Sequence, residues 1–175
     1  MTVTRSGSVE LVAVDDVVLD DLVRIAVEDA SADDVTPPLT ADGSWSDERI
    51  AWLRAYHQDR RGGLAGPCRE RTWAVRAEGM IVGAVRLAAG PAGETAAELG
   101  IWLARSTRGR GLGAAAVRLL VDEASAAGVA TLSASTRESN QAALRILRSV
   151  GFTTDRPGPD GAVEARRGPA QSDPA

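Results

Sequence analysis

The sequence predicts an α/β fold with a mixed sheet. Short alternating apolar stretches, typical of strands, interleave with stretches at helical spacing along the chain. A glycine-rich turn at residues 108–113 stands between a predicted strand and a predicted helix, and another strand follows that helix. A strand, helix and strand in this order form a crossover unit, so we expect the two strands to pair in parallel.

The composition is that of one ordinary globular domain. The chain has 175 residues, of which 44% are hydrophobic and 25% charged, and its net charge is -4. This balance does not favour nucleic acid as a partner, so any anion site must be local. The single cysteine, Cys68, excludes an internal disulfide and a cysteine-based zinc site, and no metal is implied.

We expect a cytoplasmic protein with no membrane partner. The apolar N-terminal stretch "VELVAVDDVVLDDLV" is interrupted by four aspartates, which argues against both a membrane span and a signal peptide. Residues 1–166 are predicted to form a single domain. The polar, proline-containing residues 167–175 are predicted to be a disordered tail.

The first predicted elements are a strand and a helix. Residues 9–14 alternate weakly between apolar and polar, which favours a strand. Asp15 or Asp16 can cap the helix that follows, and the apolar positions from Val18 onward recur at helical spacing.

A long connection precedes the second predicted helix. It covers residues 29–45, where Pro37 and Pro38 block a helix, and a connection of this length is often a lid or binding loop. The second helix opens at Ser46 and should end at the glycine pair that begins with Gly62.

The middle of the chain predicts a three-strand meander. Residues 71–77 and 81–88 alternate and are joined by a short turn, so they form a hairpin. A Gly/Pro-rich loop leads to the third strand, residues 96–104, which enters the glycine-rich turn.

The last part predicts helix, strand, helix and hairpin. An apolar stripe predicts a helix over residues 112–127 that stops at Gly128, and residues 129–136 form the next strand. A final helix opens at Asn140 and ends at Gly151, before a closing hairpin.

The glycine-rich turn is suited to a pyrophosphate. A helix N-terminus carries unpaired N–H groups and a positive dipole end, which a turn without side chains leaves open to phosphate oxygens. A Walker P-loop is excluded because no Gly-Lys-Ser/Thr ending is present, and a Rossmann turn lacks the acidic residue expected about 20 residues later. Coenzyme A is the third ligand class, and its pyrophosphate can lie on such a turn.

At this point the sequence resembles the GCN5-related N-acetyltransferases (GNAT). Their pyrophosphate motif, Arg/Gln-x-x-Gly-x-Gly/Ala, is matched by residues 108–113, and their last helix, from Asn-x-x-Ala to Gly-Phe, is matched by residues 140–152. The strand "AELGIWL" looks most like the branch of ribosomal-protein alanine acetyltransferases. The resemblance implies a mostly antiparallel central sheet, helices on both faces and a parallel crossover at the CoA site.

The resemblance implies transfer of an acetyl group from acetyl-CoA to a primary amine by direct attack. Backbone N–H groups around residues 101–103 would polarise the thioester carbonyl. The cofactor contacts implied by the resemblance are Ile101, Trp102, Leu103, Arg108, Gly109, Arg110, Gly111, Leu112, Gly113, Asn140 and Ala143.

The catalytic residues implied by the resemblance are Glu98 and Asn140. Glu98 would be the base, acting through water, although a glutamate on a solvated strand face or in an ion pair fits the same position. Asn140 would contact the cofactor or a water, and it can also cap the last helix. Many members carry a tyrosine as the acid where this chain has Leu147, so the thiol leaves either as thiolate or with help from water or a serine.

Three residues are candidates for binding the acceptor. Tyr56 and His57 lie on the second helix, which borders the acceptor cleft in this family, although a partly exposed helix face is an alternative reading. Trp45 ends the long connection and could stack on a substrate.

Two functions remain open from the sequence. The first is an N-acetyltransferase for a small amine, such as an antibiotic, polyamine or amino acid derivative, or for a protein N-terminus. The second is a non-catalytic acyl-CoA-binding sensor or partner module, which the absent tyrosine keeps open. Homodimers are common in the family.

Overall fold

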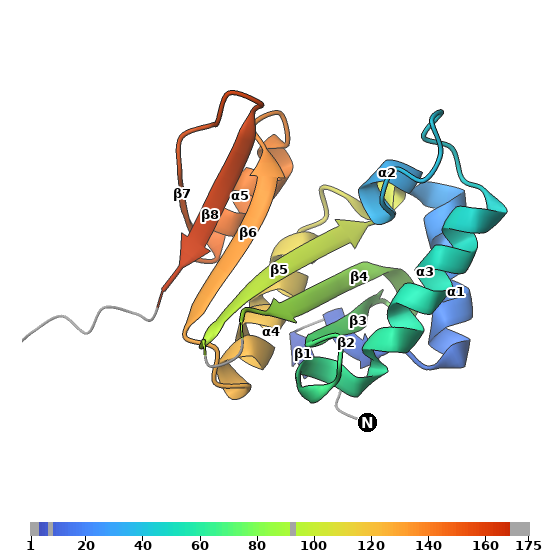
Figure 1. Ribbon diagram of the computed structural model, residues 1–175, viewed down its shortest axis with the longest axis horizontal. Helices are drawn as coiled ribbons and strands as arrows, with labels where there is room; N and C mark the ends of the chain where they lie inside the picture. The colour runs from blue at the N-terminus through green and yellow to red at the C-terminus, as the bar shows by residue number, and fades with distance from the viewer. Residues whose placement is uncertain (1–3, 7–8, 92–93, 169–175) are drawn as a thin grey trace, which may run out of the picture.

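A computed structural model describes residues 4–6, 9–91 and 94–168 (Figure 1). Its strands form one sheet in the order β1-β2-β3-β4-β5-β6-β8-β7. Strands β5 and β6 pair in parallel, and the other neighbouring strands pair antiparallel, which confirms the predicted fold class. The strands are β1 (Thr4–Ser6), β2 (Val9–Ala13), β3 (Glu70–Ala77), β4 (Met80–Ala89), β5 (Ala96–Leu103), β6 (Thr131–Arg137), β7 (Thr153–Thr154) and β8 (Ala162–Arg167).

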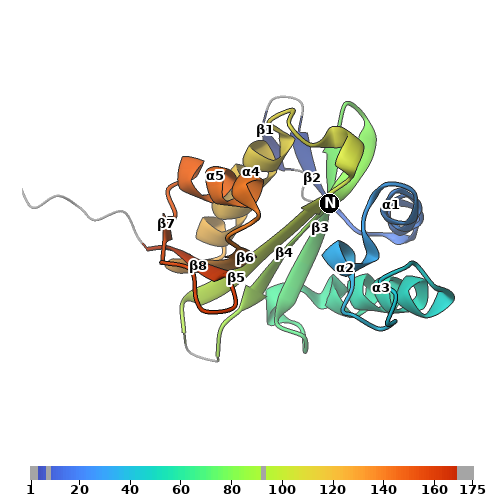
Figure 2. The ribbon, with the colours of Figure 1, turned by 90° about the horizontal axis from the view of Figure 1, so that it is seen from above.

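Helices lie on both sides of the sheet. Figure 2 shows α1, α2 and α3 on one side and α4 and α5 on the other. The helices are α1 (Asp16–Asp29), α2 (Ala32–Val35), α3 (Asp47–Asp59), α4 (Leu112–Ala126) and α5 (Gln141–Ser149), with short 3₁₀ turns η1 (Arg60–Ala65) and η2 (Arg105–Thr107).

Two hydrophobic clusters, one on each face of the sheet, hold these layers together. Helix α1 packs its buried face, which includes Leu19 and Leu22, against small residues of the sheet such as Ala84. Helix α4 packs on the opposite face, where Val117 and Leu120 are fully buried. Alternation along the central strands sends successive side chains to opposite clusters, because strand side chains have a period of two.

The starts of the first two long helices follow from side-chain caps. The carboxylate of Asp15 accepts a hydrogen bond from the Val18 amide at 2.9 Å, and the Ser46 hydroxyl accepts one from the Arg49 amide at 3.2 Å. Each cap satisfies an amide that the helix itself leaves unpaired.

The structure differs from the sequence-based elements at three places. The long connection contains the one-turn helix α2, which precedes Pro37, so the prolines end a helix rather than preventing one. Helix α3 itself ends at Asp59, and the 3₁₀ turn that follows loses helical geometry at Gly63 (φ 66°, ψ -159°), so the glycine pair does end this helical segment as predicted. Strand β1 was not predicted. Arg167, placed by the sequence in the tail, pairs with Leu132 in β8, while residues 169–175 lie outside the described residues.

In the part of the chain that the structure describes, no helix is both long enough and apolar enough to cross a membrane.

Candidate active site

Strands β5 and β6 separate halfway along their length. Their parallel pairing covers three residue pairs and ends at Glu98 and Ser133. On the other edge of β5, antiparallel pairing with β4 continues to Leu103. The amide of Ala104 donates to the carbonyl of Val82 in β4 at 2.9 Å. Backbone amides along a strand point alternately to its two sides, so the Ile101 amide, three residues earlier, points away from β4 and toward the gap. The gap therefore presents a backbone donor to a carbonyl oxygen.

A cleft of about 710 Å³ opens from this gap. Its walls come from the second half of β5, the glycine-rich turn, the start of α4, the end of β6 and α5. It is large enough for an extended organic ligand rather than a single small metabolite. We call it the cofactor cleft.

The glycine-rich turn has the backbone geometry that an anion site needs. Gly109 and Gly111 adopt left-handed φ values of 78° and 77°, and within the described residues nothing lies within 4 Å of a Cβ built at either position. Gly111 caps α4 without a side-chain hydrogen bond, so the first amides of that helix are open to a ligand. The residues present therefore fit the pyrophosphate of coenzyme A.

Arg108 connects the turn to other parts of the molecule. Its Nε and Nη2 atoms donate to the Leu103 carbonyl, each at 3.3 Å, and Nη2 also lies 3.2 Å from the Asp34 carboxylate. The side chain is half exposed, so its guanidinium can also reach an anion in the cleft.

Most of the cofactor contacts expected from the sequence line this cleft. Two do not: Arg110 pairs with Glu78 at 2.8 Å, and Leu112 is buried in the core beneath α4. The expected contacts that line the cleft are Ile101, Trp102, Leu103, Arg108, Gly109, Gly111, Gly113, Asn140 and Ala143.

Asn140 and Leu147 lie in the wall formed by the last helix. The Asn140 side chain accepts a hydrogen bond from the Ala143 amide at 3.1 Å, so this residue caps α5 and lines the cleft at the same time. Leu147 also lines the cleft, and it offers no proton to a leaving group there.

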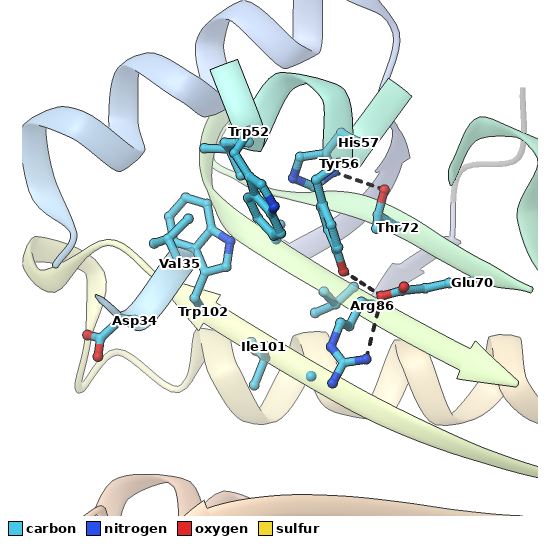
Figure 3. Close-up of a pocket in the computed structure, with 14 residues that line it drawn as sticks. Asp34, Val35, Trp52, Tyr56, His57, Glu70, Thr72, Arg86, Ile101 and Trp102 are labelled. Atoms are coloured by element: carbon cyan, nitrogen blue, oxygen red, sulfur yellow. Dashed lines mark hydrogen bonds and ion pairs between the residues drawn. The ribbon is translucent and has the colours of Figure 1, made fainter. Parts of the chain in front are cut away.

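A second cleft of about 350 Å³ lies between β5 and α3 (Figure 3). Aromatic side chains form much of its wall. The rings of Trp52 and Tyr56 stack with centroids 4.9 Å apart, and the Arg60 guanidinium lies 3.7 Å from the Tyr56 ring centroid. Trp102 of β5 also lines the cleft. We call this the acceptor cleft.

A chain of charged groups centred on Glu70 runs along the floor of the acceptor cleft. The Tyr56 hydroxyl donates to Glu70 Oε1, Arg60 Nε donates to Glu70 Oε2 at 2.7 Å, and Arg86 Nη1 lies 3.5 Å from Glu70 Oε1. Arg86 continues the chain, because its Nη2 also donates to Glu98. Gly100 lies beneath Arg86, and a Cβ there would be only 2.7 Å from Arg86 Nε.

This network sets the protonation of Glu70 and Tyr56. Burial by itself would raise the pKa of Glu70, but hydrogen bonds from Tyr56 and Arg60 and the charges of Arg60 and Arg86 outweigh it and hold that pKa below its usual value. The pKa of Tyr56 is raised, first by burial and then by its hydrogen bond to Glu70 and the charge of that carboxylate. At neutral pH the pair is therefore a carboxylate and a neutral phenol.

His57 lies behind Tyr56 and is 2% exposed. Its Nδ1 is 2.9 Å from Thr72 Oγ1, and its Nε2 has no hydrogen-bond partner among the described residues. Burial, and then the charge of Arg60, lower the pKa of His57 to about 4 against the opposing effect of Glu70, so the imidazole is neutral at physiological pH.

Of the candidate acceptor-binding and catalytic residues from the sequence, some line the acceptor cleft and others lie outside both clefts. Tyr56 and His57 both line the acceptor cleft. Trp45 lines neither cleft and donates from Nε1 to the Ala30 carbonyl at 3.1 Å. Glu98 also lines neither cleft, since it lies where β5 is still paired on both edges, and its carboxylate contacts Arg86.

Sequence reasoning missed Trp52, Glu70 and Arg86. They come from α3, β3 and β4, and no motif links them along the chain. The strand pairing could have pointed to Arg86. It lies directly opposite Thr72 of β3 on one side and Gly100 of β5 on the other, and all three line the acceptor cleft. The strand register was needed to use it.

The two clefts meet at β5. Gly100, Ile101 and Trp102 line both of them, together with Asp34 from α2. The two clefts therefore share one stretch of wall, at the opening between β5 and β6.

Comparisons with known proteins give a family. A family model described as "Acetyltransferase (GNAT) domain" matches residues 14–153. No curated protein matches the sequence.

Several solved structures share the fold. The acetyltransferase from Salmonella typhimurium that modifies the N-terminal serine of ribosomal protein L7/L12 is 18% identical and superposes with a TM-score of 0.74 over 95% of this chain and 99% of that one. Mycobacterium smegmatis RimJ, solved with CoA-disulfide, is 18% identical with a TM-score of 0.74 over 99% and 88%. The microcin C7 self-immunity acetyltransferase MccE, solved with acetyl-CoA and AMP, is 13% identical with a TM-score of 0.69 over 93% of each chain.

Proposed function

The chain belongs to the GNAT acetyltransferase family and is an N-acetyltransferase that uses acetyl-CoA, and on that premise we propose that the acetyl group crosses from the cofactor cleft to a primary amine in the acceptor cleft. The observation that carries this proposal is the junction of the two clefts at residues 100–102 of β5. Two reactants that meet at one opening react in an effectively unimolecular step.

The proposal assigns the cofactor cleft its contacts. The open amides at the start of α4 and the guanidinium of Arg108 would bind the pyrophosphate of acetyl-CoA. The Ile101 amide would donate to the thioester oxygen, where negative charge develops during attack. Asn140 would hold the start of α5 in place and contact the cofactor from that wall.

The proposal assigns the acceptor cleft a cationic amine. Its lining contains two carboxylates, Asp34 and Glu70, and one guanidinium, Arg86. Aromatic side chains on the same walls favour an ammonium group near their faces. A peptide N-terminus and a small amine both fit this chemistry, so both belong in the first test.

The thiol would leave as the thiolate. The cofactor cleft offers Leu147 where a proton donor would otherwise stand. A free thiol has a pKa of about 8.5, so release of the anion is feasible near neutral pH.

Three further expectations from the sequence stay predictions. The first is Glu98 as the base acting through water; its carboxylate contacts Arg86, which lines the acceptor cleft. A homodimer and a cytoplasmic location are also carried forward, and light scattering of the purified chain tests for the homodimer.

The experiment is thiol release from acetyl-CoA in the presence of a panel of small amines and short peptides. Release that requires an amine, with the acetylated amine identified by mass spectrometry, would support the proposal and identify the acceptor class. Tight binding of acetyl-CoA without transfer to any amine would favour the alternative, a non-catalytic acyl-CoA-binding module.

A further inference from the structure

The acceptor cleft contains a phenol and a carboxylate to which the assignments above give no part in the transfer step itself. Tyr56 is the only tyrosine of the chain, and Glu70 is a buried carboxylate with 7% exposure. They contact each other directly in the wall of the cleft (Figure 3). We call them the Tyr56–Glu70 pair.

We propose that the Tyr56–Glu70 pair takes the proton from the attacking amine: Tyr56 is the catalytic residue that receives it, and Glu70 acts through Tyr56. This inference rests on the proposed function, since it needs an amine in the acceptor cleft. It names a proton acceptor different from Glu98.

The position of the phenol oxygen supports the proposal. Glu70 Oε1 accepts from the Tyr56 hydroxyl and also faces Arg86 Nη1 at 3.5 Å, so the phenol lies next to the Arg86 guanidinium. The same guanidinium lies over Gly100, at the opening where the two clefts meet. The phenol is therefore placed beside the site of attack.

The orientation of the ring is held from its sides. Trp52 stacks on Tyr56 with an interplanar angle of 19°, and the Arg60 guanidinium lies over the ring. These residues are spaced four apart on α3 and its 3₁₀ extension, so one helical face presents all three. A proton acceptor needs this kind of fixed geometry to reach the same atom in each turnover.

The charges around Glu70 keep it able to accept a proton. Arg60 and Arg86 face the carboxylate, with Tyr56 donating to it and the neutral His57 nearby. Glu98 faces Arg86 from the other side. A carboxylate between two guanidinium groups stays ionised at neutral pH, and after accepting a proton it returns that proton readily to water.

The proton transfer balances within the reaction. The bound ammonium first gives one proton to solvent, which leaves a neutral amine with a free lone pair. That lone pair forms the C–N bond to the thioester carbon, and the C–S bond breaks with its electron pair leaving on sulfur. The N–H proton, made more acidic by the new bond, passes to the Tyr56 oxygen while the phenol proton passes to Glu70. Glu70 then gives its proton to solvent, so the pair is restored.

Glu98 is less well placed for this role. Its side chain is 48% exposed and lies at the end of the β5–β6 pairing, outside the residues that line either cleft. Its carboxylate contacts the same Arg86 that orients Glu70, which suits a residue that positions Arg86.

The test compares kcat and KM of Tyr56→Phe and Glu70→Gln with those of the wild type, using the best amine of the panel. Phenylalanine keeps the stacking on Trp52 and removes only the hydroxyl. Each change should lower kcat by about 10²-fold and leave the KM for acetyl-CoA unchanged. The double variant should lose no more than either single variant, because residues that act as a unit are not additive.

The matched control is Glu10→Gln. Glu10 is a largely buried carboxylate of the same sheet, it pairs with Arg76 at 3.7 Å, and it lies outside the residues lining both clefts. Its replacement should leave kcat at the wild-type value. Acetyl-CoA binding by each variant, measured by calorimetry, checks that the protein is folded.

A pH profile separates proton transfer from a structural role. In Glu70→Gln the phenol must lose its own proton before it can act, so kcat should rise steeply toward alkaline pH, and the Tyr56→Phe/Glu70→Gln double variant should not show this rise. Wild-type kcat should lack that phenol-dependent rise.

Three results would overturn the inference while the proposed function stands. They are wild-type kcat in Tyr56→Phe, a loss confined to the KM of the amine, or a large loss of kcat in Glu98→Gln while Tyr56→Phe and Glu70→Gln keep the wild-type value. If the wild type itself transfers no acetyl group, it is the proposed function that fails.

Discussion

At the scale of single residues, His57 links stability to pH. Its folded-state pKa of about 4 lies below the value of about 6.5 in an unfolded chain, mainly because of burial. Between these values the unfolded chain binds more protons, so this histidine's contribution to stability is complete above about pH 6.5 and is lost as pH falls toward 4.

We predict that His57→Gln removes this part of the acid sensitivity. The wild type should lose up to about 3 kcal/mol more unfolding free energy than the variant between pH 7.5 and pH 4.5. Urea denaturation at both pH values measures the difference. Parallel losses in the two proteins would show that His57 is not held neutral by the fold.

Gly100 is a residue whose missing side chain matters. A Cβ there would lie 2.7 Å from Arg86 Nε and 3.0 Å from Arg86 Cγ, so Gly100→Ala should push Arg86 away from Glu70 and Glu98. We predict a loss of kcat of about tenfold or more, because a small displacement of a positioned group is costly, with acetyl-CoA binding preserved.

Steady-state kinetics and calorimetry measure these two effects. Gly62→Ala is the control, since a Cβ at Gly62 would make only an ordinary contact with Pro67 at 3.8 Å. An unchanged kcat in Gly100→Ala would mean that the position of Arg86 does not matter for transfer.

At the scale of elements, Arg49 of α3 holds the segment that contains α2. It is fully buried, and its guanidinium donates to Asp33 at 2.8 Å, Thr36 at 3.0 Å and Thr40 at 3.0 Å. One side chain thus replaces the hydrogen bonds that an irregular segment cannot make with itself. The same segment contributes Asp34 to both clefts.

We predict that Arg49→Met lowers the unfolding free energy by about 2–4 kcal/mol, because several hydrogen bonds to a charged group are lost in a buried place. Hydrogen exchange of residues 31–45 should accelerate more than that of the sheet. Arg54→Met, on the same helix, removes an exposed ion pair with Asp20 and should cost at most about 1 kcal/mol. Equal effects of the two changes would contradict the role assigned to Arg49.

At the scale of the whole molecule, a pair of contacts joins the α1–α2 region to the segment around the glycine-rich turn. Asp34 contacts Arg108, and Asp29 accepts from the Ser106 amide at 3.0 Å. The guanidinium that would bind pyrophosphate is therefore shared with a residue of the acceptor cleft. If Arg108 binds pyrophosphate as proposed, Asp34 competes with the cofactor for it.

We predict that Asp34→Asn tightens binding of coenzyme A by about threefold, since an exposed ion pair competes weakly for Arg108. Arg108→Ala should weaken binding by about tenfold or more, because a charge-assisted contact to phosphate is lost. Isothermal titration calorimetry with coenzyme A measures both. Weaker binding in Asp34→Asn would mean that Asp34 orients Arg108 instead of competing for it.

The sequence predicted the elements set by nearby residues better than those set by contacts between distant parts of the chain. Helix starts at Asp15 and Ser46, and the strand–turn–helix at residues 96–126, were predicted because caps and periodicity act between near neighbours in the sequence. Helix α2 was not predicted, because Arg49, distant in sequence, holds its segment in place.

The sequence by itself determined the fold class, the family and the glycine-rich turn before α4, because each depends on residues a few positions apart. The tertiary structure decided which side chains share the acceptor cleft. Glu70 meets Tyr56 only because α3 packs on β3, and Arg86 lies over Gly100 only because β4 and β5 pair in that register. Strand register and helix packing arise from contacts across the whole core, and no local spacing along the chain encodes them.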